Sequence, residues 1–308
     1  MKQEIVNYDG YDYDYSTYWE NREYENLAEQ NILKKFLKNE NGEWFIDIGG
    51  SYGRLANCYT GKYENCVIID YSLKTLQKNY KIITDKYPNI ILIAANAYKL
   101  PFEDSSFDGG LMVRVLHHIE NQNDYFKEVS RILKNDSIYI QEFANKRHIK
   151  ARVKAFLKHD KSIEELEPYQ QPTINLEGAK GSGVSFLNYH TIYIKTLLQK
   201  QGFKIEEKIG CSYFRIPLLK KILGTKILVF LEKTFQRIFG NTDLSPSIFL
   251  KAKSVKKEKS PTYTKLDDLL VCPNCKNKLT IDKNRAVCKN CNAKYFKKKG
   301  VWDLRIKS

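Results

Sequence analysis

Short apolar runs alternate with amphipathic stretches through the first half of the chain. The runs have the length of buried strands, so we expect strands at Trp44–Ile48, Cys66–Ile69, Ile90–Ala94, Gly109–Val113 and Ile138–Phe143. Helical periodicity lies between them at about 73–86 and 123–134. Strands that alternate with helices predict an α/β fold with an open, mostly parallel sheet and helices on both faces.

The alternation is interrupted at 145–190, where the chain is polar and contains a Gly-rich turn at Gly178–Gly183. We interpret this segment as an insertion or lid. A helix at about 189–201 and strands at Phe203–Gly210 and Ser247–Ala252 follow it. These assignments divide the chain into a cap-helix region at 1–43, a main domain at 44–252, a linker at 253–264 and a small C-terminal domain at 265–308.

A basic amphipathic stretch at Leu218–Phe239 has two interpretations. Its apolar residues recur at helical spacing, with lysines between them. Such a helix usually packs on a sheet, which is the interpretation we prefer. It could instead lie on a membrane surface or hold a lipid tail.

The composition is that of a globular protein, with 308 residues of which 42% are hydrophobic. No run approaches the roughly 18 apolar residues of a membrane-spanning helix. No secretory signal follows Met1, so we expect a cytoplasmic protein.

The net charge of +15 is unevenly distributed. From Ser254 to Ser308 there are fifteen Lys or Arg against five Asp or Glu. A basic tail fits an anionic partner such as RNA, and it equally fits a solvated surface in a chain rich in lysine.

The most informative local motif joins the first predicted strand to the next helix, in the sequence Asp47-Ile48-Gly49-Gly50-Ser51-Tyr52-Gly53. Glycines let the backbone approach a ligand closely, and the helix N-terminus after them offers free N–H donors. The second predicted strand ends at Asp70, whose carboxylate could accept hydrogen bonds from the hydroxyls of a ribose.

This loop resembles the first motif of class I S-adenosylmethionine-dependent methyltransferases, Asp-x-Gly-x-Gly-x-Gly, with Ser51 in place of the middle glycine. The resemblance continues through about residues 44–143. Segments in the family's order and spacing include Asn96-Ala97-Tyr98-Lys99-Leu100-Pro101-Phe102, Ser106-Phe107-Asp108, Val113-Arg114-Val115-Leu116-His117-His118-Ile119 and Leu133-Lys134-Asn135-Asp136.

The resemblance implies a Rossmann-like, seven-stranded sheet that binds S-adenosylmethionine. It places Asp47 and Gly49 at the methionine end of the cofactor, Asp70 at the ribose, and Asn96 and Ala97 near the adenine. The full set of cofactor-binding residues that it implies is Asp47, Gly49, Gly50, Ser51, Gly53, Asp70, Tyr71, Asn96, Ala97 and Arg114. Ser51 and Asn96 depart from the pattern, because the family has a glycine and an acid there. An amide oxygen can still accept the adenine amino proton, but without charge.

Two other classes of function fit parts of this motif. Gly49-Gly50-Ser51-Tyr52-Gly53 also matches the Gly-x-Ser-x-Gly nucleophile elbow of α/β-hydrolases, although Asp47 and Asp70 have no role in that reaction. The two departures at Ser51 and Asn96 would also fit an inactive module that binds the cofactor without turnover. Cofactor binding separates the hydrolase from the other two, and turnover separates the enzyme from the inactive module.

No general base is identified from the sequence. Arg114, His117 and His118 follow the fourth predicted strand and would lie near the active-site opening, so they are the catalytic candidates. The two histidines also occur in family members with unrelated substrates, which favours a packing role. Tyr18, Trp19 and Arg22 could close over the cofactor or simply pack the N-terminal helix.

Four of the seven cysteines form two pairs, Cys272-x-x-Cys275 and Cys288-x-x-Cys291. Two such pairs provide four thiolates for a tetrahedral, structural zinc ion. The segment around them resembles the small zinc-binding activator protein that partners tRNA, rRNA and release-factor methyltransferases. The remaining cysteines, Cys58, Cys66 and Cys211, are predicted to be buried thiols, since an odd total argues against a disulfide framework.

The methyl acceptor is predicted only by class. The chain lacks the Asn/Asp-Pro-Pro-Tyr/Phe signature with which related enzymes hold a planar amino group, and has Arg114-Val115-Leu116-His117 there. We therefore expect a small or lipid-linked metabolite, bound partly by segment 145–190. A tRNA or rRNA nucleotide is the alternative, because of the ribbon's resemblance and the basic tail. The oligomeric state is not predicted.

Overall fold

The computed structural model describes residues 17–170, 186–257 and 261–306. A central sheet has the strand order β3-β2-β1-β4-β5-β9-β8 across the main domain. Its strands are β1 (Gly42–Ile48), β2 (Tyr63–Asp70), β3 (Ile90–Ala94), β4 (Phe107–Met112), β5 (Leu133–Ala144), β8 (Phe203–Cys211) and β9 (Ser247–Ser254). The predicted α/β fold is confirmed, and Leu133 and Lys134 belong to β5 rather than to the helix before it.

The first five strands are parallel, and only β9 runs against its neighbours in this part of the sheet. β1 lies between β2 and β4, with Asp47 opposite Ile68 and Leu111. β8 is antiparallel to β9 and therefore points the same way as β5. The carboxyl ends of β1, β2, β4, β5 and β8 consequently meet at one edge, where open α/β sheets bind their ligands.

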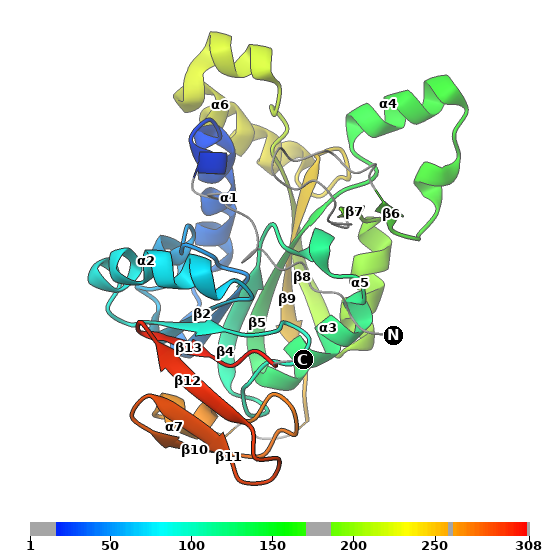
Figure 1. The fold of residues 1–308 in the computed structure, drawn as a ribbon. Coiled ribbons are helices and arrows are strands. Elements are labelled where there is room, and N and C mark those ends of the chain that lie inside the picture. The colour runs from blue at the N-terminus through cyan, green and yellow to red at the C-terminus, as the bar shows by residue number, and fades with distance from the viewer. Residues whose placement is uncertain (1–16, 171–185, 258–260, 307–308) are drawn as a thin grey trace.

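Two hydrophobic cores cover the two faces of the sheet. Alternate residues of β1 enter different cores: Trp44, Ile46 and Ile48 face one, and Phe45 faces the other. The first core includes apolar residues of α3 (Gln122–Ile132) and α5 (Thr191–Lys200), and the second those of α1 (Glu23–Phe36) and α2 (Leu73–Lys86). Helices therefore cover both faces, as the sequence predicts (Figure 1).

After β5 the chain leaves the sheet, and α4 projects from it as part of an arm (Figure 1). The described residues of segment 145–190 form α4 (Ile149–Lys158), a 3-10 turn at Ser162–Glu164, and the paired short strands β6 (Tyr169–Gln170) and β7 (Leu187–Asn188). The Gly-rich turn at Gly178–Gly183 lies outside the described residues.

The basic amphipathic stretch forms α6 (Pro217–Phe239), which is interrupted at Gly224, where φ is 66°. The preferred prediction that its apolar stripe packs on the sheet is wrong for much of the stripe. Leu228 and Glu232 are buried, while Leu218, Ile222 and Ile227 are 51–65% exposed. The reason is that α6 lies beyond the edge of the sheet, against α1, rather than across its face. No helix within the described ranges has the length and apolar content to cross a membrane.

Glu232 connects α6 to the rest of the domain. Its buried carboxylate accepts hydrogen bonds from the Tyr24 hydroxyl and from the backbone N–H groups of Ser212 and Tyr213, the latter two at 2.7 and 3.1 Å. Burial raises the pKa of this carboxyl group. The contacts join α6 to α1 and to the end of β8.

The C-terminal domain extends the central sheet instead of forming a separate one. After the short helix α7 (Leu266–Leu269), its strands are β10 (Leu279–Asp282), β11 (Arg285–Cys288), β12 (Lys294–Lys298) and β13 (Val301–Asp303). β13 pairs in parallel with β3, with Trp302 opposite Ile93, and so gives one sheet of 11 strands. The ribbon is therefore part of the same structural unit as the main domain.

Candidate functional site

A cavity opens at the carboxyl edge of the sheet, beside β1, β2 and β4. Its empty volume, including the open mouth, is about 1230 Å³. It is lined by Trp19, Asp47–Tyr52, Arg54, Leu55, Ile69–Ser72, Thr75, Ala95–Tyr98, Met112–Val115, His118 and Ile119. All the predicted cofactor residues except Gly53 lie on its wall.

The loop after β1 has a conformation that requires small residues. Gly49 has φ of 76°, and a Cβ atom there would lie 2.5 Å from Val115 Cγ2. A Cβ atom on Gly50 would lie 2.7 Å from the carboxyl carbon of Asp47. Ser51 also has a positive φ, of 49°, a region that favours glycine, as in the family motif. Gly53 has φ of 75° and faces Ile68 and Ile83 rather than the cavity, so its role is in the turn.

Asp70 connects the end of β2 to this loop. Its Oδ2 accepts a hydrogen bond from the backbone N–H of Ser51 at 3.1 Å, and its Oδ1 accepts one from Ser72 at 2.9 Å. A carboxylate oxygen has two lone pairs, so these contacts orient the group while it retains capacity to accept from a ligand hydroxyl. Tyr71, the next residue, also lines the cavity.

Asp47 lies at the bottom of the loop with 2% of its surface exposed. The hydroxyl of Tyr59 donates a hydrogen bond to its Oδ2 at 2.9 Å. Burial raises the pKa of Asp47 to about 7, although the Tyr59 hydrogen bond opposes this shift. A nearby cationic ligand favours the ionised form of a carboxyl group, so it can change the protonation of a group whose pKa lies near neutral pH.

Asn96 and Ala97 line the opposite wall of the cavity, after β3. The side-chain oxygen of Asn96 accepts a hydrogen bond from the backbone N–H of Tyr98 at 2.8 Å. This contact fixes the turn that carries both residues. The amide side chain therefore has a structural function where the family motif has an acid.

Arg114 lies in a network of buried charges that was not predicted from the sequence. Its Nε donates a hydrogen bond to Oε1 of the buried Glu29 at 2.7 Å, and its backbone N–H donates one to Glu142 at 2.8 Å. Glu29 also accepts a hydrogen bond from Arg54 at 2.7 Å. The carboxylates of Glu29 and Glu142 raise the pKa of Arg114 despite its burial, so Arg114 is a permanent cation.

A sequence signal for Glu29 existed. This acid precedes Ile32, Leu33 and Phe36 by three, four and seven residues, so it lies within the apolar stripe of its own helix. An acid at such a position requires a buried partner. The partners, Arg54 and Arg114, are too distant in sequence to be identified from this pattern.

Of the two catalytic histidine candidates, only His118 lines the cavity. His117 stacks on Phe186, with ring centroids 4.9 Å apart and an interplanar angle of 13°. Burial and the nearby His118 and Arg114 hold the pKa of His117 well below its ordinary value of 6.5. His117 is thus a packed, neutral side chain, which agrees with the packing role considered for it.

The N-terminal region contributes Trp19 to the cavity wall. The guanidinium of Arg54 lies over the Trp19 ring, 3.6 Å from its centroid. Arg22 instead lies over the ring of Tyr18, at 4.1 Å. Trp19 is therefore placed to contact a ligand, whereas Arg22 interacts with its neighbour.

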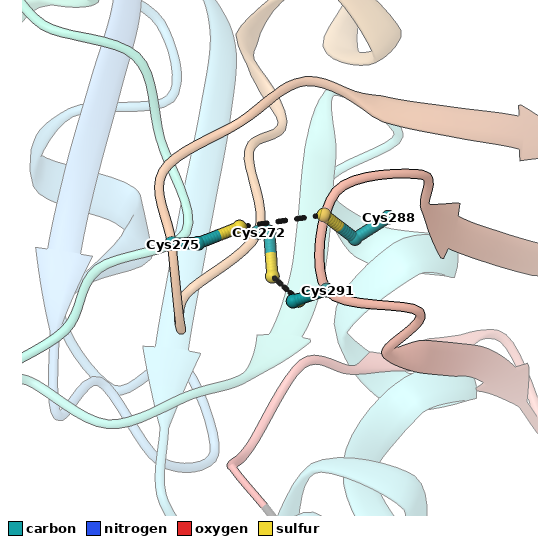
Figure 2. Close-up of side chains that lie close together, drawn as sticks. All are labelled: Cys272, Cys275, Cys288 and Cys291. Carbon is teal, nitrogen blue, oxygen red and sulfur yellow. Dashed lines mark hydrogen bonds between the residues drawn. The ribbon is translucent and has the colours of Figure 1, made fainter.

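The four cysteines of the ribbon come together from two loops (Figure 2). Their sulfur atoms all lie within 4.8 Å of one another, and Cys272–Cys291 and Cys275–Cys288 are 3.5 and 3.4 Å apart. Zinc–sulfur bonds of about 2.3 Å in a tetrahedron place the sulfur atoms about 3.8 Å apart. The four thiols are not disulfide-bonded, so their number and spacing fit a structural zinc ion.

The ribbon also reaches the edge of the cavity. The backbone N–H of Leu304 donates a hydrogen bond to the carbonyl of Ala94 at 2.8 Å, directly before the cavity residue Ala95. Arg305 Nη1 donates one to the carbonyl of Tyr71 at 3.2 Å. The ribbon therefore supports two segments of the cavity wall.

Comparisons with known proteins agree with this arrangement. Residues 46–140 match the family model of a methyltransferase domain. An uncharacterized protein of Methanocaldococcus jannaschii, MJ1252, is 30% identical over 226 residues, which cover 71% of this chain and 80% of that protein.

Two solved structures share the fold. One from Listeria monocytogenes, described as an S-adenosylmethionine-dependent methyltransferase, has a TM-score of 0.54 and 16% identity, and covers 75% of this chain and 98% of its own. A chain from the Haloferax volcanii complex between the Trm112 methyltransferase activator and a methyltransferase has a TM-score of 0.52 and 13% identity. The match covers 79% of this chain and 99% of that one.

A parallel sheet with a glycine loop after its first strand and an acid after its second occurs in class I methyltransferases and in other α/β folds that bind a nucleotide cofactor. The sequence match over this region agrees with that class. Residues 46–140 form a methyltransferase domain, and the chain belongs to the same family as MJ1252.

Proposed function

We propose that the chain transfers the methyl group of S-adenosylmethionine to a small or lipid-linked metabolite. The observation that carries this proposal is the cavity at the carboxyl edge of the sheet. There the loop after β1, the acid at the end of β2 and the turn after β3 surround one space. The same space opens toward Arg114 and His118, where an acceptor would enter.

The cofactor would lie along this wall. Asp47 and Gly49 would hold its methionine end, Asp70 and Tyr71 its ribose, and Asn96 and Ala97 would lie near its adenine. The positions of these residues in one cavity support the assignment. The close packing at Gly49 and Gly50 supports it further, since any side chain there would displace the backbone.

The chemistry is an in-line displacement at the sulfonium methyl group, which is already activated by the positive sulfur. The protein must mainly align the acceptor and exclude water. Arg114 stays positively charged and therefore cannot accept a proton. His118, which lines the cavity, is the candidate general base for an acceptor that retains its proton.

The second candidate is an RNA methyltransferase. Two observations favour it: the ribbon is basic, and its β13 joins the sheet beside the cofactor site. The similar Haloferax chain comes from a complex with the Trm112 methyltransferase activator. In this chain the ribbon would act as an activator that belongs to the same polypeptide as the catalytic domain.

One experiment separates these candidates. The purified protein is incubated with methyl-labelled S-adenosylmethionine and an extract of its source cells, and the products are separated into lipid, small-molecule and RNA fractions. We expect label in the lipid or small-molecule fraction. Label in RNA alone would replace the first candidate with the second. Cofactor binding without any labelled product would favour the inactive module.

A further inference from the structure

Two helices carry much of the exposed apolar surface of the described chain. On α4, Phe156 and Leu157 are 80% and 72% exposed, and on α6 Phe230 is 69% exposed. We define the α4/α6 surface by its exposed apolar residues Ile149, Val153, Phe156, Leu157, Leu218, Ile222, Ile227 and Phe230, and its exposed lysines Lys150, Lys154, Lys158, Lys221, Lys226 and Lys233. Side chains of this size are rarely exposed together without a partner.

The topology places this surface beside the cofactor cavity. α4 begins five residues after β5 ends, and α6 begins six residues after β8 ends. Both strands end at the carboxyl edge of the sheet, where the cavity opens. The two helices accordingly project from the same end of the molecule (Figure 1).

The exposed charges on the two helices are all positive. The sequence of α4 contains Lys150, Arg152, Lys154 and Lys158 and no acid. α6 contains a single acid, Glu232, and this residue is buried. An apolar face flanked by exposed lysines has the composition of a helix that lies in the interface of an anionic bilayer.

An apolar cavity lies between the start of α4 and the C-terminal part of α6. Its wall includes His148 and Ile149 at the start of α4, and Phe235 and Phe239 of α6. Pro246, on its wall, precedes Ser247, whose hydroxyl donates a hydrogen bond to Glu142. The same carboxylate accepts a hydrogen bond from the backbone N–H of Arg114, which lines the cofactor cavity. The apolar cavity therefore lies close to the proposed active site.

We propose that the α4/α6 surface docks the protein on an anionic lipid bilayer, so that a lipid acceptor enters the active site directly from the membrane. The acceptor part of this inference rests on the proposed function, whereas the docking does not. Lysines on one face would repel a second copy of the same face. Proteins bind RNA mainly with cationic side chains at its phosphates and with aromatic rings stacked on its bases. Exposed Ile, Val and Leu side chains would therefore gain little from an RNA partner.

Co-sedimentation with vesicles tests the docking. The full-length protein is mixed with vesicles of phosphatidylcholine alone, or of phosphatidylcholine with phosphatidylglycerol. We expect binding only with the anionic lipid, and weaker binding as salt is added. Phe156→Asp or Phe230→Asp should lower the partition constant about tenfold or more. Lys154→Ala or Lys226→Ala should each lower it about fivefold.

Matched controls come from other helices. Ile82 on α2 is 70% exposed and Lys127 on α3 is exposed, so Ile82→Asp and Lys127→Ala should leave vesicle binding unchanged. Calorimetry with S-adenosylmethionine should give the same affinity for every variant, which shows that the fold is intact. Equal binding to both vesicle types, or wild-type binding by the α4 and α6 variants, would overturn the proposal. Loss of tRNA binding in the same variants would identify an RNA surface instead.

Discussion

Arg114 Nε donates a hydrogen bond to Oε1 of Glu29 at 2.7 Å, which joins the loop after β4 to helix α1. Glu29 is fully buried, so its charge depends on Arg114 and Arg54. The contact holds one wall of the cofactor cavity against the N-terminal helix. Stability and cofactor binding are therefore expected to depend on this pair.

Glu29→Gln should lower the free energy of unfolding by about 3 kcal/mol, since it removes the buried carboxylate that pairs with Arg54 and Arg114 while both arginines stay charged. Urea denaturation measures the change, with the exposed Glu20→Gln as control. Burial alone would raise the pKa of Glu29, but the charges and hydrogen bonds of Arg114 and Arg54 outweigh burial and lower it from 4.5. The stabilisation is thus complete above about pH 4.5 and decreases as the pH falls through the folded-state pKa. An unchanged acid profile in Glu29→Gln would contradict this role.

Asp70→Ala should weaken S-adenosylmethionine binding about ten- to a hundredfold, because loss of a charged hydrogen-bond partner costs about 1.5–3 kcal/mol. Titration calorimetry measures the affinity, which we expect in the micromolar range for the wild type. Asp85→Ala removes an exposed acid from α2 and should have no effect. If the wild type does not bind the cofactor, the central assignment is wrong.

Asp47 makes cofactor binding depend on pH. Its pKa of about 7 means that the carboxylate becomes ionised as the pH rises through neutrality. The sulfonium and ammonium groups of the cofactor favour the ionised form, so the affinity should increase with pH across this range. Calorimetry below and above that pKa measures the effect, and Asp47→Asn should remove the dependence. A flat profile in the wild type would place the methionine end of the cofactor elsewhere.

Metal analysis should find one zinc ion per chain. Removing it by chelation, or by Cys272→Ser, should unfold the ribbon and lower the melting temperature of the whole protein. The ribbon buries Trp302 and Leu304 against the main domain, and each such side chain stabilises by about 1.5–3 kcal/mol. The exposed Lys289→Ser is the control. Zinc loss with an unchanged melting curve would show that the ribbon does not support the main domain.

Arg305→Ala tests the connection between the ribbon and the cavity. It removes the hydrogen bond to the Tyr71 carbonyl, which should weaken cofactor binding about three- to tenfold while the zinc content stays the same. Arg285→Ala removes an exposed cation from the same domain and should leave the affinity unchanged. If the wild type, Arg305→Ala and Arg285→Ala bind the cofactor with equal affinity, the ribbon contributes to stability and not to cofactor binding.

The sequence predicted the sheet well because buried strands and amphipathic helices leave a clear periodic pattern. β3 and α2 have the predicted bounds, and the four cysteines that the spacing pairs come together in one cluster. These features depend on residues that are close in the chain. Short-range patterns of this kind determine which elements form.

Contacts between distant segments could not be predicted in the same way. The pair Glu29–Arg114 spans 85 residues, and the Arg305–Tyr71 contact spans 234. The α6 stripe was misjudged because its periodicity shows an apolar face and does not show what covers it. Only the folded chain shows that this face lies beyond the sheet.

The pairing of β13 with β3 has a consequence for how the protein is made. The ribosome synthesises β13 after every strand of the main sheet, so β3 must remain an edge strand with unpaired backbone groups until then. An open edge on a nearly complete sheet can pair with other chains and lead to aggregation. Metal supply during synthesis should therefore determine the yield of soluble protein, with zinc-starved cells accumulating aggregates of a chain whose catalytic domain is already complete.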